Sequence, residues 1–124
     1  MDAQLVKSYP APGGYVVSLQ NCINEERITG VVGWGRTYVA QQGGKHQDAK
    51  PLKGFGSAGV VEIVKDYQGD TFRAVYTVRF AGVVYVLHVF QKKSKKGSKT
   101  PKTDVELIKK RLREAEQIAR GEAP

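Results

Sequence analysis

The sequence has very little of the chemistry that holds metals or disulfides together. Cys22 is the one cysteine, which excludes a disulfide within the chain, and His46 and His88 are the two histidines. A structural zinc site needs about four Cys or His ligands. We therefore expect no metal and no cofactor, and we interpret Cys22 as a small buried hydrophobic residue.

Long apolar runs are also missing. No stretch approaches the ~20 apolar residues of a membrane-spanning helix, and residues 1–4 lack the basic and apolar segments that begin a secretory signal. The expected location is the cytoplasm, without a membrane partner. At 124 residues the chain has the length for one modest core. We predict a single domain over residues 1–124.

Positive charge is abundant and unevenly distributed. Residues 88–113 contain ten Lys or Arg against two acidic residues, which gives +8, whereas residues 1–87 contribute +2 and residues 114–124 contribute −2. Six lysines fall between Lys92 and Lys102. Such a segment is either a solvated face or a surface for polyanions, and nucleic acid is the leading candidate partner.

The second half of the chain predicts an antiparallel meander. Residues 71–80, "TFRAVYTVRF", alternate apolar and mostly polar positions, which is typical of a strand with one packed face and one open face. Residues 83–90 form a β-branched and aromatic run, and Ala81–Gly82 provides a short turn between the two strands. Residues 59–64, followed by a turn at residues 65–70, supply a third strand.

A helix is predicted after the lysines. Thr103 and Glu106 have the spacing of a capping box, so the helix should begin at Thr103, with Asp104 in its first turn and Gly121 at its end. Apolar residues recur at spacings of three and four along it. The expected packed face consists of Val105, Ile108, Leu112, Ala115 and Ala119.

The first half is less regular. It predicts a strand at residues 15–19, a helix from about Glu25 to Gln42 and a loop at residues 42–51. The fold class is therefore α+β, with an antiparallel sheet packed by N-terminal helical structure and by a C-terminal helix.

The turn at residues 81–82 fixes the register of the predicted hairpin. Because cross-strand partners share a face of the sheet, the register gathers basic residues on the open side. The same register puts Arg79 on this face of the sheet but at the other end of its strand, ~20 Å from Arg73. The predicted pairs are Arg73 with Phe90, Val75 with His88 and Arg79 with Val84, and Lys92 joins Arg73, His88 and Phe90 on the open side.

This arrangement suits the cleavage of RNA by a ribose 2′-OH. That reaction needs a base for the hydroxyl, cations for the crowded phosphate and an acid for the leaving oxygen. Crowded cations lower one another's pKa, so a lysine can serve as a base. The candidate catalytic residues are Arg73, His88, Lys53, Lys92 and Lys93, and the candidate RNA-binding residues are Lys95, Lys96, Lys99 and Lys102. The alternative interpretations are simple phosphate contacts for Arg73 and Lys92 and local hydrogen bonding for His88.

Residues 39–112 resemble the phage-related HigB-like toxins of the RelE/ParE superfamily. The segments "FRAVYTV", "YVLHVFQKKS" and "TPKTDVELIKKRL" match in order and spacing. The resemblance implies a RelE-like fold and a toxin of a type II toxin–antitoxin system. It implies a metal-independent endoribonuclease that cuts messenger RNA, commonly on the ribosome, and so inhibits translation. The implied partners are messenger RNA, the ribosome and an antitoxin that often carries a helix-turn-helix domain.

The resemblance also implies residue roles. Arg73 matches the arginine that binds the phosphate, Lys92 or Lys93 matches the basic residue closing the last strand, and Lys53 is similar to a candidate base. No tyrosine follows Tyr85, whereas some RelE relatives have one near the final helix, so we assign the acid role to His88 or a lysine. Residues 1–38 are atypical of the family. A ParE-like inhibitor of DNA gyrase and a non-catalytic remnant that still binds antitoxin remain as alternatives.

Overall fold

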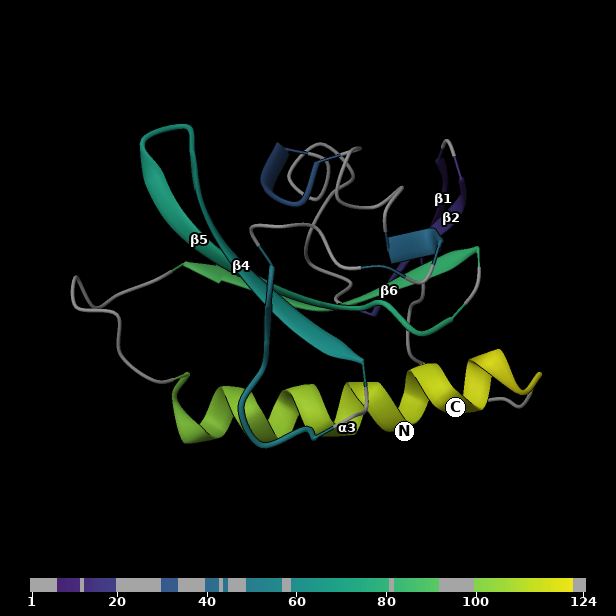
Figure 1. The fold of residues 1–124 in the computed structure, drawn as a ribbon. Helices are drawn as coiled ribbons and strands as arrows, with labels where there is room; N and C mark the ends of the chain where they lie inside the picture. The colour runs from purple at the N-terminus through teal and green to yellow at the C-terminus, as the bar shows by residue number, and fades with distance from the viewer. Residues whose placement is uncertain are drawn as a thin grey trace.

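A computed structural model describes residues 7–11, 13–19, 30–33, 40–42, 44, 49–56, 59–80, 82–91 and 100–121. The strands in these residues form one mixed sheet in the order β1-β2-β6-β5-β4-β3, and a long helix, α3, lies across one of its faces (Figure 1). The elements are β1 (Lys7–Ala11), β2 (Gly14–Ser18), β3 (Lys50–Pro51), β4 (Val60–Tyr67), β5 (Asp70–Thr77), β6 (Val83–Gln91) and α3 (Lys102–Ala119).

The predicted meander is confirmed as β4, β5 and β6, which pair antiparallel in sequence order. The turn between β4 and β5 is tighter than the predicted residues 65–70. It consists of Gln68 and Gly69, whose φ angles are 51° and 86°. Two consecutive positive φ angles are characteristic of the type I′ turn, whose twist matches that of the flanking strands, so the hairpin can extend to Tyr67 and Asp70.

The sheet is not purely antiparallel, so that part of the prediction is wrong. β2 confirms the strand expected at residues 15–19, but it pairs parallel to β6, with Tyr15 opposite Val83. The Tyr15 N–H donates to the Gly82 carbonyl over 2.9 Å. The two backbones approach closely at this point, because a Cβ on Gly14 would lie 1.9 Å from the Gly82 oxygen. β1 then pairs antiparallel with β2 and forms the edge of the sheet.

The continuous helix expected from Glu25 to Gln42 is wrong. Gly33 has a φ of 84°, which is outside the helical range, so the helical conformation of Gly30 and Val31 does not continue through it. Much of that range lies outside the described residues, and no N-terminal helix is seen packing on the sheet within them. The sheet face opposite α3 is covered by short segments whose buried residues are Val31, Val32, Ala40 and Ala49.

The capping box predicted at Thr103 is wrong, and α3 begins one residue earlier. Pro101 is the N-cap residue, and no side chain caps the helix. The Pro101 carbonyl instead accepts the Val105 N–H at 3.0 Å, which starts the helical hydrogen-bond pattern before Thr103. The end was predicted correctly, since Gly121 has a φ of 80° and donates its N–H to the Ile118 carbonyl.

α3 buries Ile108, Leu112 and Ala115 against the sheet, where Val75 and Leu87 belong to the same core cluster. Full burial of one such Leu or Ile contributes about 1.5–3 kcal/mol, so this contact holds the helix firmly. Ala119, expected on the packed face, is exposed, and Ile118 packs instead. Because α3 covers this face, the prediction that it is open is wrong.

Candidate active site

The β5–β6 register positions the predicted site. A β-bulge interrupts the ladder after Val75, because Tyr76 pairs with Val86 and Leu87 becomes an extra residue on β6. Before the bulge the prediction is confirmed. The observed pairs there are Arg73 with Phe90 and Val75 with His88.

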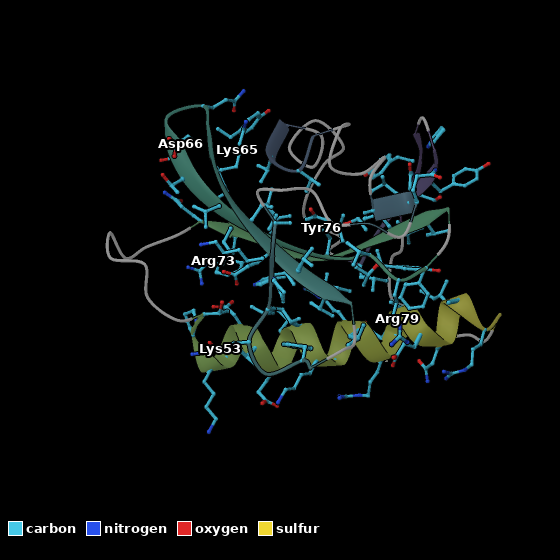
Figure 2. The ribbon with its side chains drawn as sticks, in the orientation of Figure 1. Lys53, Lys65, Asp66, Arg73, Tyr76 and Arg79 are labelled. Carbon is cyan, nitrogen blue, oxygen red and sulfur yellow. The ribbon has the colours of Figure 1, made fainter. Side chains whose placement is uncertain are left out.

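Arg79 lies at the opposite end of the helix-covered face. Its predicted pairing with Val84 is wrong, because β5 ends at Thr77. Its Nη2 instead donates to the Glu116 carboxylate at 2.6 Å, and its guanidinium lies 4.8 Å from the centre of the Phe80 ring. Figure 2 shows Arg79 near the C-terminal half of α3 and Arg73 near its start. The expected separation of the two arginines is therefore confirmed.

Arg73 is buried where α3 begins, with only 5% of its surface exposed. Its Nη1 donates to the Thr100 hydroxyl oxygen at 2.7 Å, and Thr100 stands just before α3. Phe90 is its cross-strand partner, and Gln91, which pairs with Phe72, is the last residue of β6. Gln91 and Thr100 flank the lysine-rich segment 92–99. Thr100 contacts Arg73 itself, and Gln91 pairs with Phe72, the residue before Arg73.

His88 is also buried, with 7% exposure, rather than open. Its Nδ1 lies 3.0 Å from Arg111 Nη1 and its Nε2 lies 2.8 Å from an Asp104 oxygen, while its ring stacks on Phe90. A guanidinium can only donate, so Nδ1 accepts and Nε2 carries the proton toward Asp104. Burial, aided by the Arg111 charge, lowers the pKa of His88, and the bond to Asp104 opposes this only in part. His88 is therefore held neutral.

The same Arg111 Nη1 donates to the Leu87 carbonyl at 2.8 Å. Leu87 is the extra residue of the bulge, so the arginine satisfies a carbonyl next to the interrupted ladder. We call His88, Asp104 and Arg111 the His88 network. It was missed from the sequence. Two signals pointed to it: Asp104 and Arg111 lie seven residues apart on one helix face, and His88 is the only histidine in an apolar strand run.

Lys53 is exposed in the turn that follows β3. The preceding Leu52 is buried and donates its N–H to the Val60 carbonyl, which fixes the start of this turn. Figure 2 shows Lys53 and Arg73 toward the same half of α3. Lys102 is exposed at the first residue of α3. The remaining predicted site residues lie outside the described residues, and these are Lys92, Lys93, Lys95, Lys96 and Lys99.

Metal ligands do not gather in the part of the chain that the structure describes, where no group of three or more His, Cys, Asp or Glu could hold an ion. Cys22 and His46 lie outside that part. None of the helices within it is long and apolar enough to cross a membrane.

Residues 26–113 match the model of the family described as Phage derived protein Gp49-like (DUF891). The chain belongs to the Gp49-like family. Gp49-like proteins are related to the RelE/ParE toxins and are associated with the toxins of toxin–antitoxin systems. The matched span contains β3 to β6, the first part of α3 and the whole His88 network. No curated protein and no solved structure gives a significant match to the chain.

Proposed function

We propose that this Gp49-like protein is a HigB-like toxin that cuts messenger RNA without a metal ion and thereby blocks translation. The observation that carries the proposal is the position of Arg73. Its cross-strand partner Phe90 and its hydrogen-bond partner Thr100 stand on the two sides of segment 92–99, which contains five lysines. Five lysines in the sequence between these two partners of one arginine favour the binding of a phosphodiester there.

The proposed chemistry uses cations alone. Lys53 or another lysine takes the proton of the 2′-OH, and the 2′-oxygen then attacks the adjacent phosphorus. Arg73 is 5% exposed and bonded to Thr100, so it must exchange that bond for a phosphate oxygen when RNA binds. With Lys92 and Lys93 it then stabilises the negative charge that builds up on the phosphate oxygens. The 5′-oxygen leaves with a proton from an acid. The products are a 2′,3′-cyclic phosphate on one fragment and a 5′-hydroxyl on the other.

The acid is better assigned to a lysine than to His88. Both ring nitrogens of His88 are engaged, and burial lowers its pKa, so it carries little transferable positive charge at neutral pH. His88 instead acts as a positioning residue. Its ring stacks on Phe90 at 4.6 Å and steadies the strand position opposite Arg73.

The family association implies an antitoxin partner. A helix-turn-helix antitoxin, messenger RNA and the ribosome are the partners of the proposed toxin, with Lys95, Lys96, Lys99 and Lys102 contacting RNA phosphates. The proposed location is the cytoplasm.

Arg73 can be tested against its hydrogen-bond partner. Arg73→Met removes the guanidinium and should reduce RNA cleavage by about 10²–10³-fold, the usual effect of losing one such transition-state contact. Thr100→Val removes only the hydroxyl that Arg73 reaches, so cleavage should remain close to that of the unchanged protein. The measurement is messenger cleavage in a cell-free translation reaction containing EDTA, with end-group analysis and a thermal melt of each variant.

The outcomes separate the alternatives. A folded Arg73→Met variant that cuts at the full rate removes Arg73 from the mechanism, and equal losses in both variants make the residue structural. Intact messenger alongside inhibited DNA gyrase supports a ParE-like protein instead. If induced expression of the unchanged chain causes no growth arrest, the protein is a remnant that only binds antitoxin.

A further inference from the structure

The side of α3 that faces away from the sheet is strongly basic. The packed side is defined by Ile108, Leu112 and Ala115, and successive residues turn by about 100° around the helix axis. The opposite side therefore carries residues at spacings of three, four and seven. Figure 1 shows that no strand lies on that side. The exposed basic residues of this surface, which we call the α3 stripe, are Lys102, Lys109, Lys110, Arg113 and Arg120.

The charge of the α3 stripe is largely uncompensated. Its one acidic residue is Glu106, which is 63% exposed and lies 3.8 Å from Lys109. The other acidic residues of α3 point elsewhere: Asp104 and Glu116 bind His88 and Arg79, and Glu114 is buried. Within the described part of the chain, Lys102, Lys110 and Arg113 form no ion pair.

The α3 stripe has no apolar anchor for a protein partner. Among the described residues the large exposed hydrophobic side chains are Tyr15 and Val64, and both lie on strands. Protein interfaces concentrate aromatic and apolar residues at their centre and are depleted of lysine. Surfaces that bind a nucleic-acid backbone are polar and positively charged. The composition of the stripe therefore favours phosphates.

The stripe is also straight and rigid. From Lys102 to Arg120 the helix rises by about 27 Å, and its packed side fixes it to the sheet. A single strand would have to be ordered along this length, whereas the phosphates of a double helix already hold fixed positions. We propose that the α3 stripe binds the backbone of double-helical RNA, on a surface that shares Lys102 with the proposed Arg73 site and otherwise extends away from it along α3. The inference rests on the proposed function only in taking RNA as the partner.

Two matched double variants test the proposal. Lys110→Gln with Arg113→Gln removes two charges from the stripe, and Lys50→Gln with Lys65→Gln removes two from β3 and β4. The probe is an RNA hairpin with a long perfect stem, and fluorescence anisotropy gives its Kd over a series of salt concentrations. The slope of log K against log salt is negative, and each lost phosphate contact reduces its magnitude by about 0.9. For the stripe variant the magnitude of the slope should therefore be smaller by about 2 than for the unchanged chain. For the control variant the slope should equal that of the unchanged chain.

A change in the opposite direction adds a second measurement. Glu106→Gln removes the one acidic charge of the stripe and should tighten stem binding. Equal loss in the two double variants would mean that net charge alone is measured, and this overturns the proposal. The proposal is also overturned if the stripe variant loses as much affinity for a single strand of the same length as for the stem. It is overturned too if the unchanged chain binds only vesicles of phosphatidylglycerol or only an acidic peptide.

Failure of this proposal is distinguishable from failure of the proposed function. If the unchanged chain cuts no RNA but the stripe variant loses stem affinity, the toxin chemistry fails and the stripe stands. If cleavage depends on Arg73 while the salt slope is the same for all variants, the stripe proposal fails alone.

Discussion

Arg111 connects α3 to the irregular part of the sheet, and its replacement is the sharpest test of that connection. Its Nη1 donates both to the Leu87 carbonyl at 2.8 Å and to His88 Nδ1 at 3.0 Å. Arg111→Met keeps a long aliphatic side chain and removes both donors. Leu87 is fully buried and His88 nearly so, so bulk water is poorly placed to replace the lost partner. Two buried acceptors are then left without a donor.

The expected loss is large. Each buried acceptor without a donor costs about 1–3 kcal/mol, so the pair costs about 2–6 kcal/mol. Once the guanidinium is gone, His88 can take up a proton, so we expect a loss of unfolding free energy in the lower half of this range. A chain of 124 residues with an unfolding entropy of about 2.1 cal/mol/K per residue should then lose roughly 8 °C in Tm per 2 kcal/mol. Against a total stability of about 5–15 kcal/mol this is a major fraction.

Urea denaturation followed by circular dichroism measures the free energy of unfolding. Arg113→Met is the matched control, because Arg113 is exposed on the same helix two residues away. Its effect should stay within about 0.5 kcal/mol. If the unfolding midpoints of the two variants coincide, the hydrogen bonds of Arg111 do not hold α3 to the sheet and the reasoning is refuted.

Two further predictions concern pH and backbone contact. Burial lowers the pKa of His88 below 6.5, so the unfolded chain binds a proton more readily than the folded chain. The free energy of unfolding should therefore fall as the pH drops below 6.5 and level off below the folded pKa. His88→Gln should remove this part of the pH dependence in urea titrations, and an unaltered pH profile in that variant would contradict the prediction. Gly14→Ala places a Cβ 1.9 Å from the Gly82 oxygen at a φ of 146° and should destabilise by about 3 kcal/mol or more. Gly69→Ala, at a φ of 86° with nothing within 4 Å, should lose only about 1–2 kcal/mol in thermal melts, and equal losses in the two variants would refute the close contact.

The hairpin register was predictable up to the bulge and not beyond it. Alternation in residues 71–80 and the short turn place Arg73 opposite Phe90 correctly. Leu87 lies in the run "VVYVLHVF", where almost every position is apolar. Such a run gives no local sign of which residue is the extra one. The same run does indicate burial on both faces, which is the signal that the second face of the sheet is covered.

The His88 network shows why the rest of the site could not be predicted. Its three residues come from β6 and from two turns of α3, so their contact depends on how the helix docks. Docking is set by the packing of Ile108 and Leu112, and sequence spacing alone fixes neither the angle nor the height of the helix on the sheet. Arg73 was interpreted as open for the same reason.

The parallel pairing of β2 with β6 has a consequence for how the protein matures. β2 (Gly14–Ser18) precedes β6 (Val83–Gln91) in sequence, and β6 comes last among the strands that the structure describes. During synthesis the N-terminal hairpin cannot take its final place until nearly all strands have left the ribosome, since its neighbour does not yet exist. The sheet is therefore completed only after β6 has been made, so a nascent chain that stops before β6 lacks the framework on which Arg73 and α3 meet.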